Sequence, residues 1–245
     1  MELTVISHFY NEEYLLPHWL NHHKKIFTHG IMIDYDSTDN SVNIIKEICP
    51  NWTIVKSVNS DFDHIRLNQE VEKYEKDISG FRICLNTTEF ILGDFKSLSE
   101  YDDSKQILVP PFCMIDHPDM EYKELEGDLM SSRTWGFDYK TDFQFKMGRS
   151  LHNFPMEKYP NGRHYHEYNT EDFVILWYGF SPFNKELLER KLQIQNRMSE
   201  NDKKIGAGFH HITTEEKLYS ELKGHQTKCR DLKDDIDRLL KLTFE

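Results

Sequence analysis

Four clusters of polar side chains in the amino-terminal part of the chain each follow a short apolar run. They lie at residues 8–12, 34–39, 59–66 and 86–89, and they supply carboxylate, amide, hydroxyl and imidazole groups. If the apolar runs are parallel strands, their carboxyl ends share one edge of the sheet, so a single ligand can touch several clusters. The carboxylate and amide oxygens also suit a hard divalent cation such as Mg²⁺ or Mn²⁺. The pattern predicts a ligand site at that edge.

The sequence lacks the two common glycine-rich phosphate motifs. No GxGxxG follows the first apolar run and no GxxxxGK[ST] occurs anywhere, which argues against a dinucleotide fingerprint or a P-loop. The formal net charge of −12 argues against a general nucleic-acid binder. An acidic chain that binds an anionic ligand must concentrate its cationic side chains locally or recruit a metal ion. A nucleotide bound here would be held mostly by side chains.

Apolar runs and helical periodicity alternate along the amino-terminal half, which indicates the elements that position these clusters. Pro17 is expected in the first turn of the first helix and Gly30 as its left-handed cap. The alternation predicts an α/β fold whose Rossmann-like amino-terminal half has a central, mostly parallel sheet flanked by helices. Strands are expected at 3–7, 31–35, 53–58 and 81–91, and helices at 12–27, 42–48 and 61–76.

After residue 94 the regular alternation of strand and helix patterns ends. Residues 106–115 contain Pro110-Pro111, which favours an edge strand or a bent connection, and residues 117–168 read as loop-rich and partly antiparallel. A strand is expected at 173–178, followed by a helix that Ser181-Pro182 opens as N-cap and first helical residue. C-terminal helices are expected from residue 213 onward. An apolar stripe in the last helix predicts core packing or a homo-oligomer contact rather than membrane binding: Leu232, Ile236, Leu239 and Leu240.

Composition indicates a globular protein of a reducing compartment. A hydrophobic content of 38% with 13% aromatic residues can fill a core. The 4 cysteines form no CxxC pair and no zinc spacing, which predicts free, buried thiols. The first residues are too acidic for a signal peptide, and no apolar run approaches the roughly 18 residues of a membrane span. A soluble, cytoplasmic protein is expected.

The opening segment HFYNEEYLLPHWLNHHKKIFTHGIMIDYDSTDNS resembles the start of GT-A-type glycosyltransferases, particularly their family-2 and family-92 groups. In those groups the first strand ends in Asn-Glu, the next helix carries Trp and His, and the second strand runs into Asp and Ser-Thr-Asp. RICLNTTEFIL falls where they have a strand ending in Asp-x-Asp-Glu-Phe, and ILWYGFSPFNKELLERK is similar to their late strand and helix. The resemblance covers residues 3–95 well and 173–192 more loosely.

The resemblance implies a single domain that transfers a sugar from a nucleotide-sugar donor, with UDP as the expected nucleotide, to an acceptor hydroxyl on a glycan. It implies a nucleotide-binding half at 1–95, an acceptor-side half at 96–212 and C-terminal helices at 213–245. Asp36 or Asp39 is as well suited to capping a helix, and Tyr10 to packing on the next helix. The donor-contacting positions it implies are Tyr10, Asn11, Glu12, Asp34, Tyr35, Asp36, Asn59, Arg66, Asn86 and Thr88.

This sequence departs from the resemblance at the metal motif. Asn86 and Thr88 stand where the two metal-binding aspartates fall, which leaves Glu89 as the one carboxylate, and Trp177 stands where a His is often found. One mechanism uses Glu89, the donor diphosphate and a loop histidine to hold Mn²⁺ or Mg²⁺. The histidines that come into question are His152, His164 and His166.

A second mechanism needs no metal. Cationic side chains and the helix start at Ser181 would stabilise the departing diphosphate. The cationic candidates are Arg66, Arg190, Lys191 and the pair Lys203-Lys204, among which Arg190 and Lys191 are expected at the phosphates. An inverting reaction also needs a base, for which Asp116 is the first choice and Asp138 the second, whereas a retaining one does not.

Two other functions fit the pattern less well. Loss of both metal aspartates is compatible with a catalytically degenerate protein that binds a sugar or a partner. A nucleotidyltransferase uses a similar sheet, but it is expected to have a glycine-rich, basic loop after the first strand, and SHFYNEEYLL is neither. The sequence does not identify the sugar, the acceptor or the stereochemistry.

Overall fold

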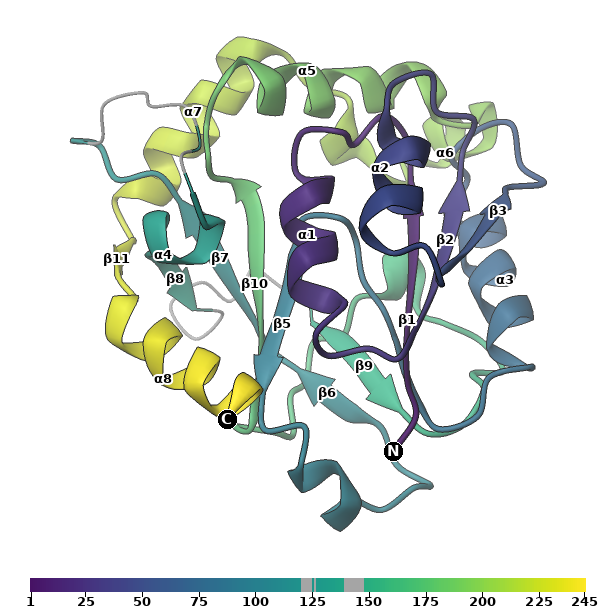
Figure 1. Cartoon of the computed structure of the whole chain (residues 1–245). Helices are drawn as coiled ribbons and strands as arrows, with labels where there is room; N and C mark the ends of the chain where they lie inside the picture. Colours follow the sequence, from purple (N-terminus) through teal and green to yellow (C-terminus); the bar gives the residue numbers. More distant parts are fainter. Residues whose placement is uncertain (120–124, 126, 139–147) are drawn as a thin grey trace.

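The computed structural model describes residues 1–119, 125, 127–138 and 148–245, which form two β-sheets and the helices around them (Figure 1). The strands are β1 (Leu3–Phe9), β2 (His29–Asp34), β3 (Thr53–Lys56), β4 (Phe81–Cys84), β5 (Glu89–Gly93), β6 (Ile107–Val109), β7 (Pro111–Ile115), β8 (Trp135–Asp138), β9 (Arg149–His152), β10 (Phe173–Phe180) and β11 (Arg230–Asp231). The α-helices are α1 (Leu16–His23), α2 (Ser41–Ile48), α3 (His64–Glu75), α4 (Leu129–Ser132), α5 (Lys185–Gln193), α6 (Glu200–Ile205), α7 (Glu215–Gln226) and α8 (Lys233–Phe244).

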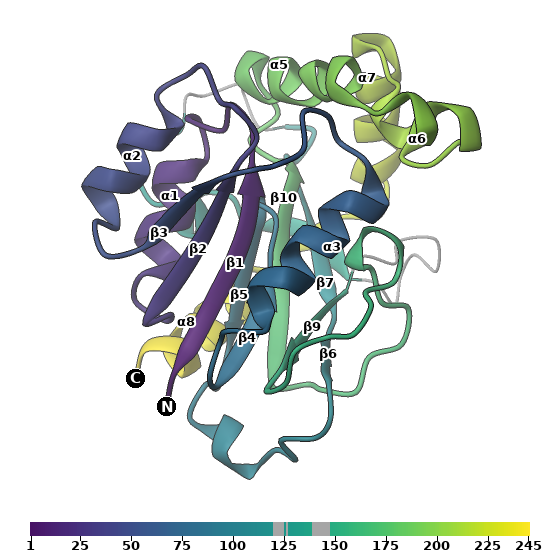
Figure 2. The same cartoon turned by 90° about the vertical axis from the view of Figure 1, so that its right-hand side faces the viewer.

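The first sheet has the order β3-β2-β1-β4-β9-β6, and its first four strands are parallel. Helices α1 and α2 lie on one face of β1–β3 and α3 lies on the other, as Figure 2 shows. This confirms the α/β fold and the mostly parallel sheet expected of the amino-terminal half. The carboxyl ends of β1 and β2 therefore meet at one edge, and α5 and α6 lie on that side of the molecule (Figure 1).

The expected fourth strand at 81–91 is two strands in two different sheets. β4 pairs with β1 in the first sheet, whereas β5 begins at Glu89 and pairs antiparallel with β10 in the second sheet, of order β11-β8-β7-β10-β5. A tight turn separates them, in which the Glu89 N–H donates to the Asn86 carbonyl at 2.9 Å. Asn86–Glu89 is thus the junction between the sheets at the carboxyl edge of β4.

Side chains of α1 occupy the edge of β5 that no strand covers. Trp19 Nε1 donates to the Glu89 carbonyl at 2.9 Å, and His22 Nε2 bonds the Ile91 carbonyl at 2.8 Å. His23 Nε2 accepts from the Ile91 N–H at 3.4 Å. Buried backbone groups need such partners, so these three side chains replace a neighbouring strand and fix Glu89 at the junction.

Two local expectations about helix caps are wrong, and one helix is shorter than expected. The first helix begins at Leu16 rather than at residue 12, with Pro17 in its first turn as expected. Gly30 lies inside β2 rather than in a helix cap. Glycine is needed there because a Cβ would stand 2.2 Å from the Trp52 ring. The helix after β10 begins at Lys185, where the Asn184 side chain accepts from the Leu187 N–H, so Ser181-Pro182 does not open it.

The C-terminal helix α8 packs against the chain's own second sheet. Leu232, Ile236 and Leu239 are buried in the main core, which gives the apolar stripe a partner within the chain.

Residues 106–115 divide at Pro110 into the edge strand β6 and the inner strand β7. All 4 cysteines are free, and three of them are buried. Over the described residues, no helix is long and apolar enough to cross a membrane.

Candidate functional site

Glu89, the carboxylate at the expected metal position, is buried and already paired. Arg149 of β9 donates to both of its oxygens, with Nε–Oε2 at 2.9 Å and Nη2–Oε1 at 2.6 Å. The Asn86 N–H adds a third hydrogen bond to Oε2 at 2.8 Å. Burial lowers the pKa of the Arg149 guanidinium, but the Glu89 carboxylate outweighs burial and raises it. A bidentate pair of this kind neutralises the carboxylate that a cation would need.

The structure does not bring Glu89 and His152 together as ligands of one ion. His152 pairs with Arg82 in register, three positions along β9 from Arg149. Its ring is fully buried and contacts Ser150 through Nδ1 and the Glu75 carboxylate through Nε2 at 3.4 Å. Both ring nitrogens of His152 therefore serve an internal polar network rather than the sheet edge.

The expected donor-contacting residues that follow β1 lie together at its carboxyl end, each with a partner from α5 or from Ile194–Arg197 after it. The Glu12 carboxylate is paired with Arg190 Nε in a partly buried contact. Asn11 bonds Gln193, and its side-chain oxygen accepts from the Thr38 N–H at 2.8 Å. The Arg197 guanidinium lies 4.4 Å from the Tyr10 ring centroid. Helix α5 and the short helical segment Ile194–Arg197 after it thus cover these positions.

The expected residues beyond β2 and β3 divide into two groups. Tyr35 is buried, its hydroxyl donates to Glu70 at 2.9 Å, and Asn59 donates to the same carboxylate at 3.1 Å. Burial raises the pKa of the Tyr35 phenol, so it stays protonated at neutral pH. Asp34 accepts from the Ser37 N–H in the turn after β2. Asp36 and Arg66 are instead exposed and paired with Lys56 and Asp61.

Three cationic side chains near this edge have no carboxylate within ion-pair distance among the described residues: Arg163, Lys191 and Arg197. Arg163 is buried, and its guanidinium bonds Asn68 Oδ1 at 3.0 Å and contacts His8 Nδ1 at 3.3 Å. Arg197 donates to the Tyr35 carbonyl at 2.7 Å. In a chain of net charge −12, this is a local excess of positive charge.

Lys191 connects this cationic group to the sheet junction. Its ammonium lies 4.1 Å from the Phe180 ring centroid and 5.6 Å from that of Trp177. Trp177 is directly opposite Glu89 in the β10–β5 register, so their side chains lie on the same face of the sheet. Burial, and next the charge of Arg190, lower the pKa of Lys191 to about 8.

Histidines around the site are held neutral. Burial, and next the charges of Arg163 and Arg149, lower the pKa of His8, and burial and the same two arginines lower that of His164. Burial lowers the pKa of His210 and, to about 3, that of His211, with Lys191 a further cause in both. The net positive charge of the site at neutral pH therefore comes from its lysine and arginines.

Sequence reasoning found Lys191 but missed Arg149, Arg163 and Arg197. Arg149 Nη1 donates to the Gly162 carbonyl at 2.7 Å and to the Arg163 carbonyl at 3.0 Å, so it holds the turn that carries Arg163. That turn has φ of 63° at Gly162 and 57° at Arg163. The signal available in the sequence was a turn-forming Asn-Gly before an arginine, which does not say where the turn folds.

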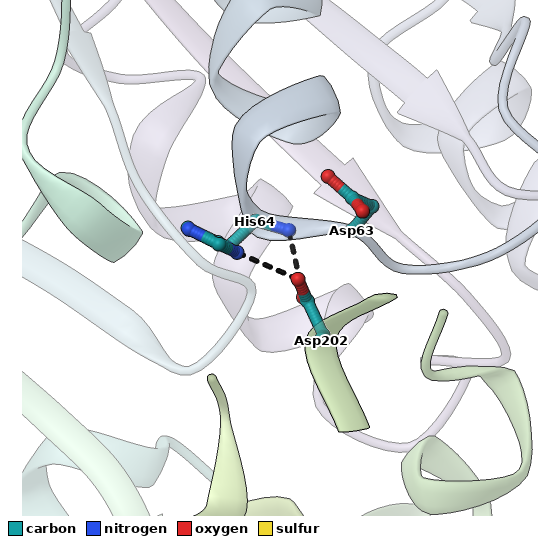
Figure 3. A group of neighbouring side chains, drawn as sticks. All are labelled: Asp63, His64 and Asp202. Carbon is teal, nitrogen blue, oxygen red and sulfur yellow. Dashed lines mark hydrogen bonds and ion pairs between the residues drawn. The ribbon is translucent and has the colours of Figure 1, made fainter. Parts of the chain in front are cut away.

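A group of three residues outside the expected sites could hold a metal ion: Asp63, His64 and Asp202, whose ligand atoms lie within 4.8 Å of one another (Figure 3). Asp202 accepts from the His64 N–H at 2.8 Å and bonds His64 Nδ1 at 2.7 Å. Burial raises the pKa of the Asp63 carboxyl, but hydrogen bonds from Arg66, Ser199 and Asn201 together lower it. These bonds tie the start of α3 to α6 and satisfy the ligand atoms within the chain.

The two base candidates lie at opposite ends of β7. Asp116 follows its carboxyl end, where Oδ1 accepts from the Ser181 hydroxyl at 2.5 Å and Oδ2 from the Phe183 N–H at 2.7 Å. Asp138 is opposite Phe112, near the amino end of β7. Asp116 is therefore on the side of the sheet edge that carries the site, and Asp138 is not.

No protein-family model matches the chain, and no curated protein matches its sequence. Similar solved structures include S. aureus TarS 1-349, with 16% identity over 53% of this chain and 40% of that chain at a TM-score of 0.36. TarS 1-349 in complex with UDP has a TM-score of 0.39 with 14% identity over 62% of this chain and 47% of that one. Its complex with UDP-GlcNAc has a TM-score of 0.36 with 12% identity, over 62% and 45%. This chain spans less than half the length of these structures, and likenesses of this strength assign no activity.

Proposed function

We propose that this chain is a GT-A-like, single-domain glycosyltransferase that uses a nucleotide-sugar donor and a glycan acceptor. The observation that carries the proposal is a group of cations at the carboxyl edge of a parallel sheet for which the described part of the chain offers no carboxylate partner: Arg163, Lys191 and Arg197. Arg163 is buried and the other two are partly buried. A charge removed from water is costly unless a partner neutralises it, so such a group is suited to an anionic ligand. A nucleoside diphosphate fits, because aromatic and amide groups of Tyr10 and Asn11 adjoin the same edge.

The proposed reaction joins the acceptor oxygen to the anomeric carbon of the sugar. The bond between that carbon and the β-phosphate oxygen breaks, its electron pair stays on the phosphate oxygen, and the acceptor proton passes to a base. We propose Asp116 as this base, because it follows β7 at the carboxyl edge. Asp116→Asn is expected to lower kcat about 10²- to 10⁴-fold with little change in donor KM. An unchanged kcat would exclude Asp116 as the base.

The proposed donor contacts follow the same placement. Tyr10, Asn11, Tyr35 and the residues around them are proposed to bind the nucleoside, and Lys191 the diphosphate. Arg190 is already paired with Glu12, so its contribution to the phosphates requires that pair to rearrange. For the divalent cation expected at Glu89, the residues present do not fit, because Arg149 holds both carboxylate oxygens.

A donor screen tests the proposal. The purified protein is incubated with a panel of UDP-, GDP- and CMP-sugars, with and without Mn²⁺, and release of free nucleotide is measured. Slow hydrolysis of one donor class is expected, together with thermal stabilisation by the matching nucleotide. If no nucleotide binds under either condition, the donor-site proposal is refuted.

A catalytically degenerate binding protein is the second candidate, and the buried Glu89–Arg149 pair favours it. Such a protein would bind a nucleotide or sugar without turning it over. Binding of UDP without hydrolysis or transfer from any donor, in the presence of an acceptor glycan panel, would support this candidate over the transferase.

A further inference from the structure

Glu89 is the single carboxylate at the position where a metal motif is expected, and four hydrogen bonds from Arg149 and Asn86 engage both of its oxygens. A cation bound there would have to displace a buried arginine whose other amino group holds the Arg163 turn. Such a displacement leaves a buried guanidinium unpaired, which is strongly unfavourable. The geometry at Glu89 therefore works against a metal ion.

Two cationic side chains nonetheless belong to residues that contact the neighbours of Glu89. Lys191 lies over Trp177, the strand neighbour of Glu89 on the same face of the sheet. The Arg163 carbonyl accepts from Arg149 Nη1, and the Arg163 guanidinium contacts His8 Nδ1 at 3.3 Å. Glu89 neutralises Arg149, and among the residues that the structure describes no carboxylate pairs with Lys191 or Arg163. Their two charges together equal the formal charge of one divalent cation.

We infer that this protein stabilises the departing diphosphate with its own cationic side chains, chiefly Lys191 and Arg163, in place of a divalent ion at Glu89. The inference rests on the proposed function. Charge grows on the β-phosphate oxygen as its bond to the anomeric carbon breaks, and fixed cations in a partly desolvated site stabilise that charge effectively. Arg163 is fixed by Asn68 and the Arg149-held turn, and Lys191 by the rings of Phe180 and Trp177.

The Asp63–His64–Asp202 group does not supply the ion instead. It joins the start of α3 to α6, and its carboxylates accept hydrogen bonds from within those segments (Figure 3). His64 Nδ1 must lose its hydrogen bond to Asp202 before it can bind a metal. Any Mn²⁺ effect through this group would disappear in Asp202→Ala, which separates it from an effect at Glu89.

The test is calorimetric titration of UDP into the full chain in EDTA and again in Mn²⁺. The expected Kd differs by less than about threefold between the two conditions, whereas a dominant metal contribution would change it more than about tenfold. Lys191→Met is expected to weaken UDP binding in EDTA about 10- to 100-fold, the usual loss for a charged hydrogen bond, and Lys191→Arg to restore most of it. Lys185→Met, an exposed lysine of the same helix, is the matched control and is expected to bind UDP normally.

Three outcomes separate the possibilities. Tight UDP binding only in Mn²⁺, or a Lys191→Met variant that binds UDP like the wild type, overturns the cation inference and leaves the proposed function standing. No UDP binding in either condition refutes the donor site itself and the inference with it. Thermal unfolding of each variant in EDTA shows whether a loss of binding reflects a loss of folding. If Lys191→Met is unfolded, UDP is titrated into Arg163→Gln in EDTA instead, and the same loss of affinity is expected.

Discussion

Acid should unfold this protein in part through His22, which α1 buries against the edge of β5. Its imidazole is 4% exposed and bonds the Ile91 carbonyl through Nε2 at 2.8 Å. Burial, which outweighs that hydrogen bond, lowers its pKa from 6.5 to about 4. The unfolded chain therefore binds a proton on His22 at a pH where the folded chain does not, and the free energy of unfolding falls as the pH drops below 6.5.

The magnitude follows from the two pKa values. The full shift corresponds to about 3 kcal/mol below pH 4, and about 2 kcal/mol is lost between pH 7.5 and pH 5. His22→Gln keeps an N–H donor for the Ile91 carbonyl but does not titrate. Urea unfolding at both pH values should therefore show a pH-dependent loss about 2 kcal/mol smaller in His22→Gln than in the wild type.

The control variant His29→Gln replaces an exposed histidine at the start of β2 and tests the general effect of removing a histidine. His8, His23 and His164 also have lowered pKa values, so the wild type should lose more stability in acid than His22 alone accounts for. Equal pH-dependent losses in the wild type and His22→Gln would refute the assignment of this acid sensitivity to His22.

Two further predictions concern the site and the helix above it. Asp202→Ala removes both hydrogen bonds to His64 and should lower the free energy of unfolding by about 2–3 kcal/mol, measured by urea unfolding; an unchanged value would contradict the role of this contact. UDP affinity should fall as the pH rises through about 8, because Lys191 then loses its proton. The titratable and charged groups that interact with the Lys191 ammonium include Arg190, Glu221, His210 and His211. Lys191→Arg should abolish this pH dependence in calorimetry, and a persistent dependence would assign it to another group.

The parallel half of the fold could be predicted because each of its strands and helices has a recognisable pattern in its own sequence. Buried strands such as β1 alternate with amphipathic helices such as α2, and both patterns are readable within a few residues. The break between β4 and β5 could not be read, because the residues of both strands are apolar and only pairing with different partners separates them. Pairing depends on β10, which lies more than eighty residues later in the chain.

The site was predictable to the same extent. The strand-end residues lie at the carboxyl edge as expected, since strand polarity alone puts them there. Their partners come from segments whose fold has no local signature, such as the turn at Gly162-Arg163 and the extension after α5 that carries Arg197. Glu89 illustrates the difference: its place at the edge was readable, but its pairing with Arg149 was not.

If Glu89 is a metal ligand, its substitution should have the opposite effects on stability and UDP binding from those expected if it only pairs with Arg149. Glu89→Gln keeps the shape of the side chain but leaves the Arg149 guanidinium buried without a negative partner, which should lower the free energy of unfolding by about 3–5 kcal/mol. It also adds one uncompensated positive charge beside Lys191 and Arg163, so UDP binding in EDTA, measured below the unfolding temperature, should be as tight as in the wild type or tighter. A metal ligand would behave in the reverse way, because its loss would weaken UDP binding in Mn²⁺ with little cost in stability. Weakened UDP binding in a stably folded Glu89→Gln variant would therefore contradict the structural role and return the metal ion to this site.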